Sequence, residues 1–276
     1  MHFTDKKVSV IVPTFNPGDY IYECFNSIKK QSLSSSLFEL IVVLNGDKEP
    51  YFSSLSTYLA TSGIQYKLEY TSSPGVSNAR NIGIEKSQYP YICFVDDDDV
   101  LSPKYLESLL ANADEEVLSI CNIKAFINTI ENSSTGFFLS EYLHNYPTGH
   151  ILKPGFLTRS ILSVPVAKLF PKQSIGNRKY NCKINNGEDS LFVTTISNKI
   201  KSLVVCDSDA VYYVRLRKGS ASRHRIPIHT LAMQSMYLFY QYTKLFFVWK
   251  PGYSYMLLFS RYIGVIKNMF VLLKNT

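Results

Sequence analysis

Short apolar runs alternate with amphipathic stretches over the first hundred residues, and this alternation constrains the fold more than any other feature of the chain. Pro, Gly, Asn or Asp bounds most of the runs, which is typical of strands. Between them, apolar residues recur at helical spacing. The alternation therefore predicts a parallel sheet covered by helices. The expected strands are 8–12, which Pro13 ends, 40–44, 65–71 and 91–95, and the expected helices begin near Asn16, Tyr51, Ser73 and Ser102.

The pattern is looser after residue 115. It predicts one or two strands in 118–129, a long loop or inserted lobe in 131–155, a helix over 187–199, and strands at 202–206 and 210–214. Ligands of a parallel sheet bind beyond the carboxyl ends of its strands. We therefore expect four polar groups of the first half to meet at one edge, namely Asn16, Asn45, residues 77–80 and residues 96–99.

The end of the chain differs in charge from the rest. The chain has 29 Lys and Arg against 22 Asp and Glu, yet no acid follows Asp209. Residues 226–276 combine bases with aromatic side chains, which favours a pair of amphipathic helices, hinged at Pro251 and Gly252, on an anionic membrane surface. Bases interrupt the apolar runs too often for a spanning helix. Alternatively, these helices pack on the rest of the chain or on another subunit; no motif indicates nucleic-acid binding.

Cysteine usage and the amino terminus bear on the compartment. The five cysteines form no CxxC pair and mostly lie in apolar runs, which indicates reduced thiols in a cytosolic protein. Residues 1–7 contain no apolar stretch of the kind that a secretory signal needs. We therefore expect a cytoplasmic protein.

Four consecutive aspartates, Asp96 to Asp99, directly follow the apolar run 91–95. Like charges at a strand end repel one another unless a cation lies among them. Mg²⁺ or Mn²⁺, which binds one or two carboxylates together with diphosphate oxygens, is the natural partner. The alternative is a solvated acidic turn that caps the next helix.

Three further segments carry possible chemistry. Residues 75–81 open a helix after a strand, where free backbone amides and Arg80 can bind an anion. Glu188 and Asp189 lie at another helix start, either as acids that suit the helix dipole or as a general base. Residues 215–223 form a basic loop that either folds over a diphosphate or is a surface cluster.

In order and spacing, these segments resemble the family 2 glycosyltransferases over about residues 6–223. The segments that carry the resemblance are 8–16, 75–81, 94–99, 167–170, 187–189 and 217–222. The resemblance implies an α/β GT-A fold: a Rossmann-like mixed sheet flanked by helices, here followed by the amphipathic helical tail. We expect one domain over 1–225, with a nucleotide-binding half at about 1–115 and an acceptor half at about 116–225, and a helical segment over 226–276.

The resemblance also implies roles for single residues. The residues it places on the nucleotide sugar are Pro13, Thr14, Asn16, Asn45, Arg80, Asp96, Asp97, Arg217 and Ser220. Asp98, with Asp96, would hold Mn²⁺ or Mg²⁺, which neutralises charge on the departing diphosphate. Asp189 would be the general base, and Glu188 would orient it or the acceptor. One departure follows the second strand. Many family members have two aspartates there, one of which contacts the base, whereas this chain has Asn45, Gly46 and Asp47, and Asn45 offers an amide in place of a carboxylate.

The resulting hypothesis is an inverting, metal-dependent hexosyl- or N-acetylhexosaminyltransferase. It would move a sugar from a nucleotide diphosphate, expected to be a UDP-sugar, to a glycan or lipid-linked glycan hydroxyl. The resemblance implies synthesis of a bacterial capsule, O-antigen or lipooligosaccharide at the cytoplasmic face of the inner membrane, and a homo-oligomer is compatible with it. Two alternatives stay open. Residues 96–100 also fit the nucleophile box of haloacid dehalogenase-like phosphatases, and the chain could be a membrane-bound sugar-nucleotide scaffold without turnover.

Overall fold

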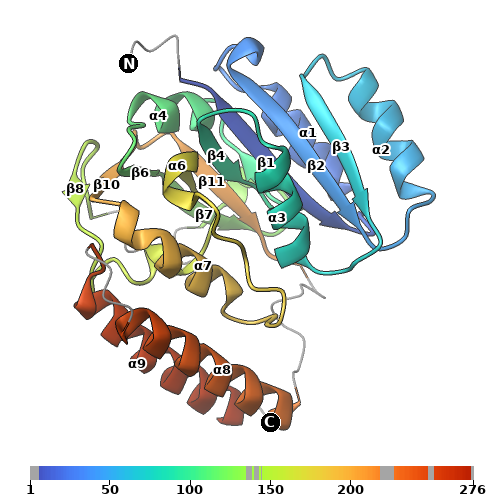
Figure 1. Cartoon of the computed structure of the whole chain (residues 1–276). Helices are drawn as coiled ribbons and strands as arrows, with labels where there is room; N and C mark the ends of the chain where they lie inside the picture. The colour runs from blue at the N-terminus through green and yellow to red at the C-terminus, as the bar shows by residue number, and fades with distance from the viewer. Residues whose placement is uncertain are drawn as a thin grey trace.

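A mixed sheet of eight strands runs through the part of the chain that the structure, a computed structural model, describes (Figure 1). That part comprises residues 6–134, 139, 143, 145–217, 227–247 and 252–274. In spatial order the strands are β3 (Tyr66–Thr71), β2 (Phe38–Asn45), β1 (Val8–Phe15), β4 (Tyr91–Phe94), β9 (Lys168–Pro171), β6 (Val117–Ile120), β10 (Ser202–Val205) and β8 (Ile151–Leu152). This architecture confirms the α/β class.

The first four strands of the chain are mutually parallel, as predicted. β1 pairs with β2 along its whole length, from Val8 opposite Phe38 to Phe15 opposite Asn45, so the carboxyl ends of both strands meet at one edge. The helices between them are also close to their predicted places: α1 (Tyr20–Lys29), α2 (Tyr51–Ala60), α3 (Val76–Lys86) and α4 (Tyr105–Ala111). α1 buries Ile21, Cys24, Phe25 and Ile28, the apolar stripe of its sequence.

Two details of the first strand–helix unit differ from the prediction. β1 does not end at Pro13 but continues to Phe15. The missing amide hydrogen of Pro13 is tolerated because pairing between β1 and β4 ends at Ile11, so no ladder bond is required there. Asn16 does not cap α1, which begins four residues later; it has a positive φ of 43° and turns its side chain toward the loop after β2.

The second half adds antiparallel pairs and a smaller sheet. β9 runs antiparallel to both β4 and β6 and so joins the two halves. The small sheet has the order β5 (Val100–Leu101), β11 (Val211–Arg215) and β7 (Asn122–Phe126). The helices of the second half are α6 (Lys172–Ile175) and α7 (Glu188–Ile196), and its 3-10 turns are Ile130–Asn132, Ile161–Ser163 and Ser197–Lys199; a further 3-10 turn, Ser35–Leu37, precedes β2 in the first half. The strands predicted in 118–129, 202–206 and 210–214 are confirmed, whereas β9 was not predicted, because four residues that begin with Lys168 lack a strand pattern.

One hydrophobic core connects both halves. A single cluster of buried side chains extends from Val8 in β1 to Leu257 near the end of the chain. α3 approaches β1 so closely that a Cβ atom at Gly83 would lie 2.3 Å from Cγ2 of Ile11. The absence of a side chain at Gly83 therefore lets α3 lie directly on the central strand.

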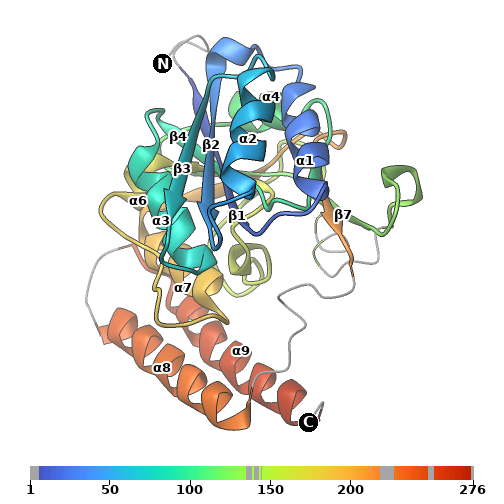
Figure 2. The same ribbon diagram turned by 90° about the vertical axis from the view of Figure 1, so that its right-hand side faces the viewer.

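The predicted helix pair at the end of the chain is present and packs on the rest of the protein. α8 (Ile228–Phe247) and α9 (Tyr255–Lys274) lie side by side against α7 (Figures 1 and 2). Leu238, Tyr242 and Val265 form a second buried cluster with Ile184 and Leu191. Pro251 of the predicted hinge lies outside the described residues, and Gly252 has a φ of 105°.

One base of this tail, Arg261, is buried against the rest of the chain. It is only 3% exposed, and its guanidinium donates to Thr194 Oγ1, Ser163 Oγ and the Leu162 carbonyl, each at 2.8 Å. It therefore ties α9 to α7. None of the helices among the described residues is both long and apolar enough to cross a membrane.

Candidate active site

The carboxyl ends of β1 and β2 are joined by side-chain amides. Asn45, at the end of β2, donates to the Thr14 carbonyl at 2.8 Å and accepts from the Gly75 amide at 2.9 Å. Asn16 donates to the Asp47 carboxylate at 3.0 Å and accepts from the Asp47 amide at 2.9 Å. Both predicted nucleotide contacts therefore lie at the ligand edge. Asn45 is 2% exposed, and both the NH2 group and the carbonyl oxygen of its side chain are bonded to backbone groups of the protein.

The four aspartates after β4 have four different environments. Asp97 accepts from the Thr14 hydroxyl at 2.5 Å, and burial raises the pKa of Asp97 to about 6. Asp99 is 4% exposed and accepts from the Arg215 amide at 2.8 Å; burial raises the pKa of Asp99 as well. Tyr212 contacts both ends of the turn, because its hydroxyl accepts from the Asp96 amide at 3.0 Å and is hydrogen-bonded to Asp99.

Arg80 connects this turn with α7. Its Nη2 lies 3.0 Å from Asp96 Oδ1, and its Nη1 lies 2.6 Å from Asp189 Oδ1. The Arg80 side chain is 4% exposed, against 40% for Asp96 and 25% for Asp189, so both carboxylates keep a face toward solvent. The structure thus brings together three of the predicted site residues from three separate segments of the chain.

Asp189 has the electrostatics of a proton acceptor that works near neutral pH. Burial raises its pKa to about 7, Arg80 opposes that rise, and Glu188 and Asp96 add to it. Glu188 is its neighbour in the first turn of α7, and burial raises the pKa of Glu188 too. A carboxylate that is about half ionised at pH 7 can accept a proton from a bound hydroxyl.

Arginines from the end of β11 face the aspartates from the other side. Arg217 Nε lies 2.5 Å from Asp98 Oδ2, with its guanidinium 5.6 Å from the centre of the Tyr20 ring. Arg215 lies between the rings of Tyr20 and Phe126 and pairs with Glu23 at 2.5 Å. Arg217 is therefore placed to contact an anion next to Asp98. Ser220, the other residue predicted in this loop, lies outside the described residues.

The donor set fits a hard divalent cation that is completed by substrate oxygens. Among the described side chains, no three His, Cys, Asp or Glu form a group that could hold a metal alone. Mg²⁺ and Mn²⁺ do not require such a group, because one or two carboxylates plus phosphate oxygens suffice. Asp96 and Asp98 could supply those carboxylates. Burial is the main cause of the raised pKa of Asp97 between them, and the charges of Asp98 and Asp96, which a cation would offset, raise it further.

Sequence reasoning missed three side chains at this site. Tyr212 and Tyr20 contact the acidic turn and its arginines, and Tyr180 lies beneath Arg80, with the guanidinium 5.4 Å from its ring centre. Tyrosines are common in this chain, 20 in all, and none of the three belongs to a motif. These three tyrosines reach the site only through the packing of strands and helices that are distant in the sequence.

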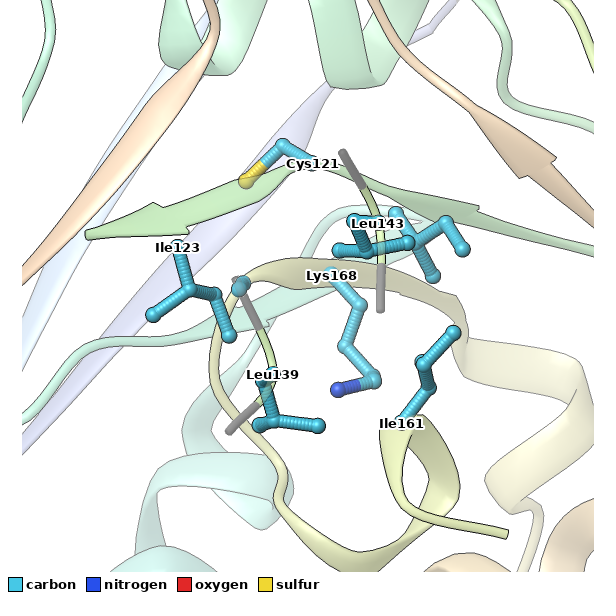
Figure 3. Close-up of a pocket in the computed structure, with 8 residues that line it drawn as sticks. Cys121, Ile123, Leu139, Leu143, Ile161 and Lys168 are labelled. Atoms are coloured by element: carbon cyan, nitrogen blue, oxygen red, sulfur yellow. The ribbon is translucent and has the colours of Figure 1, made fainter. Parts of the chain in front are cut away.

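Lys168, from the segment 167–170, has a structural position instead. Figure 3 shows its side chain among apolar residues, including Ile123, Leu139 and Ile161. Its Nζ donates to the Val164 and Val166 carbonyls at 2.9 and 2.8 Å, and burial lowers its pKa to about 7. The described side chains around it leave no room for a water molecule. Lys168 therefore fixes the loop that leads into β9.

Comparison with known proteins agrees with this geometry. A family model described as "Glycosyl transferase family 2" matches residues 9–158. The poly(ribitol-phosphate) beta-N-acetylglucosaminyltransferase TarP of Staphylococcus aureus strain N315 is 27% identical over 224 residues, which are 79% of this chain and 65% of TarP. TarS of S. aureus strain Mu50, of the same description, is 25% identical over 216 residues, 77% of this chain and 36% of TarS. The chain thus spans less than two thirds of either relative.

Solved structures share the fold. The crystal structure of S. aureus TarS 1–349 with UDP-GlcNAc matches with a TM-score of 0.74 at 18% identity, over 96% of this chain and 72% of that one. The mannosyltransferase PcManGT from Pyrobaculum calidifontis, solved with GDP-Man and Mn²⁺, matches with a TM-score of 0.64 at 14% identity, over 98% and 74%. At these identities the matches show the GT-A fold alone, which confirms the predicted architecture.

Replacement of Arg80 tests the bridge. Arg80→Met keeps the apolar volume and removes the charge. At pH 8 the variant leaves the partly buried Asp189 carboxylate without its cation, so Asp189 either stays ionised with no partner or takes up a proton at a cost, and we expect the free energy of unfolding to fall by about 2–4 kcal/mol. At pH 5 Asp189 is protonated in the folded state, since its pKa is raised to about 7 and loss of Arg80 raises it further, so the cost should be smaller.

Urea unfolding at both pH values measures this difference. Lys201→Met is the control, because Lys201 pairs with Glu116 on the surface, where the two side chains are 76% and 48% exposed. That variant should change stability by less than about 1 kcal/mol at either pH. An equal loss at pH 5 and pH 8 in Arg80→Met would show that the bridge contributes packing rather than charge.

Proposed function

The chain belongs to glycosyl transferase family 2, and we propose that it transfers a sugar from a UDP-sugar to a hydroxyl of a surface glycan or lipid-linked glycan, with inversion. UDP-GlcNAc is the first donor to test, because TarP and TarS are N-acetylglucosaminyltransferases and TarS was solved with UDP-GlcNAc. The single observation that carries the proposal is the Arg80 bridge, which holds Asp189 beside Asp96 at the ligand edge of the sheet.

In this proposal Asp189 removes the proton from the acceptor hydroxyl. The hydroxyl oxygen attacks the anomeric carbon on the face opposite UDP, a new carbon–oxygen bond forms, and the bond to the diphosphate oxygen breaks. The configuration inverts because a single displacement occurs. Arg80 favours the ionised form of Asp189, and Glu188, next to it in α7, orients it or the acceptor.

The donor occupies the ends of β1, β2 and β4 in this proposal. Asp98 and Asp96 would hold Mn²⁺ or Mg²⁺, which neutralises charge on the departing diphosphate. Arg217, at 2.5 Å from Asp98, would contact the same diphosphate. The nucleoside would lie along Pro13 and Thr14, with Asn16 and Asp97 forming the rest of its edge, while Asn45, whose amide is bonded within the protein, would hold Thr14 in place. Membership of a transferase family argues against the phosphatase alternative. A carboxylate at Asp189 that can accept a proton argues against a scaffold without turnover.

We propose further that the outward face of the α8–α9 pair lies on an anionic membrane at its cytoplasmic side. Apolar residues recur along it at spacings of three, four or seven, which places them on one face of each helix. The exposed members are Met233, Met236, Tyr240 and Phe247 in α8 and Met256, Phe259, Ile263, Ile266 and Phe270 in α9. Lys244 and Lys267 are exposed on the same helices, and the absence of acids after Asp209 makes this surface complementary to anionic lipid.

Asp189→Asn tests the assignment of the base. The variant should bind UDP-GlcNAc within about threefold of the unchanged protein and lose on the order of 10²–10⁴ in kcat, because positioned proton transfer contributes that much. In the unchanged protein, kcat/KM should rise with pH, reach half of its plateau near pH 7, because burial raises the pKa of Asp189 to about 7, and level off above about pH 8. Steady-state transfer assays across pH measure both. Glu188→Gln is the comparison: a larger loss in Glu188→Gln than in Asp189→Asn would move the base to Glu188.

Asp98→Asn tests the metal site. The unchanged protein should bind UDP-GlcNAc at least about tenfold more tightly with Mn²⁺ than with a chelator, because the ion screens the diphosphate. Asp98→Asn should lose that difference while retaining the affinity seen with chelator, as measured by titration calorimetry. Asp209→Asn, whose carboxylate pairs with Lys104 on the surface, is the matched control. A full metal effect in Asp98→Asn would exclude Asp98 as a ligand.

The membrane proposal is tested with the whole chain. The double variant Met236→Glu/Phe259→Glu places acids on two side chains that are 65% and 55% exposed, so the fold should tolerate them. It should no longer float with vesicles that contain anionic lipid, because apolar insertion and charge attraction are both lost. Leu157→Glu, at a 74% exposed site outside the tail, should float normally. If the unchanged protein does not float but forms an oligomer, and the double variant is a monomer, this face contacts a second copy of the chain and not a membrane.

A further inference from the structure

Three buried polar atoms without a partner lie beside the Arg80 bridge. Among the described residues, Ser77 Oγ, Arg80 Nε and the Tyr180 hydroxyl have no hydrogen-bond partner. The residues are 5%, 3% and 3% exposed. Ser77 and Arg80 lie one turn apart on α3, and the Arg80 guanidinium lies over the Tyr180 ring. A buried donor without an acceptor destabilises a folded protein, so an unpaired donor next to a proposed substrate site is a candidate contact for the substrate.

Tyr180 is held rigidly in this position. Its ring stacks on Phe192 of α7, with ring centres 3.9 Å apart and planes 13° apart, and meets the edge of Phe94 of β4. Asn81 clamps its backbone: the side-chain amide accepts from the Tyr180 amide at 2.7 Å and donates to the Tyr180 carbonyl at 3.0 Å. The hydroxyl is therefore unpaired although both the ring and the backbone of Tyr180 are fixed.

The surroundings of the hydroxyl define what it can bind. Burial raises the pKa of Tyr180 well above its ordinary value, against the effect of Arg80, and Asp189, Asp96 and Glu188 raise it further. The hydroxyl therefore keeps its proton and is a donor at neutral pH. The charged groups that influence it are Arg80, its two partners Asp189 and Asp96, and Glu188, so the hydroxyl lies close to the Arg80 bridge.

We propose that the Tyr180 hydroxyl is a contact for the transferred sugar, donating a hydrogen bond to a hydroxyl or acetamido oxygen of the pyranose. This inference rests on the proposed glycosyl transfer, in which the sugar must lie between the diphosphate and Asp189. The sugar would supply the acceptor that the protein lacks. Tyr180 thereby contributes to the choice of sugar and makes no contact with UDP itself.

Tyr180→Phe separates this role from a structural one. Without ligand, its melting temperature should equal or exceed that of the unchanged protein, because the substitution removes an unpaired buried hydroxyl. With Mn²⁺, its Kd for the preferred sugar among UDP-GlcNAc, UDP-GalNAc, UDP-glucose and UDP-galactose should rise about tenfold, the effect of one lost hydrogen bond in a buried site. Its Kd for UDP should stay the same. Titration calorimetry on the full chain gives both constants.

Tyr105→Phe is the matched control. Tyr105 is also fully buried, but its hydroxyl contacts Cys93 Sγ at 3.4 Å in the core. This variant should melt at a lower temperature than the unchanged protein, and the ratio of its Kd for the UDP-sugar to its Kd for UDP should stay the same. An unchanged ratio in Tyr180→Phe, or a lower melting temperature with both constants weakened alike, would overturn the role of Tyr180 alone. Failure of the unchanged protein to bind any of the UDP-sugars would overturn the proposed function and this inference with it.

Discussion

One guanidinium, that of Arg80, organises the site. It joins Asp96 at the end of β4 to Asp189 at the start of α7, two residues that are far apart in the sequence. A buried arginine is tolerated only with partners, and two carboxylates on the same cation stay close despite their like charge. Arg80 is placed in turn by α3, and the residue just before that helix, Gly75, donates its amide to Asn45 at the end of β2. The position of the proposed base therefore depends on packing in the first half of the chain.

The tail supports α7 from the opposite side. A Cβ atom at Gly187, just before Glu188, would lie 2.8 Å from Leu238 of α8, so the helix start is packed closely against the tail. The Ser190 and Tyr242 hydroxyls lie 3.0 Å apart, and Arg261 bonds to Thr194. α7 thus lies between the Arg80 bridge and the α8–α9 pair. The inner face of the tail therefore helps to hold in place α7, the helix that carries Asp189.

The sequence predicted most of the fold because its strands are continuous apolar runs and its helices have clear apolar stripes. It failed where pairing with other strands decides the structure: Pro13 remains in β1 because β4 has already diverged, and β9 is a strand because β4 and β6 enclose it. The candidate site residues came from motifs. Their mutual arrangement, above all the Arg80 bridge and the place of Tyr180, depends on tertiary packing that no local pattern encodes.

The charge balance of the site explains why a cation belongs to the proposed reaction. Six acids, Asp96 to Asp99 with Glu188 and Asp189, face three arginines, of which Arg215 is shared with Glu23. Burial raises the pKa of several of these carboxyls, to about 6 for Asp97, and so favours their neutral forms. A diphosphate would add more negative charge to the same place. A divalent cation held by Asp96 and Asp98 would offset this conflict, since it would neutralise charge on the donor and on the aspartates together.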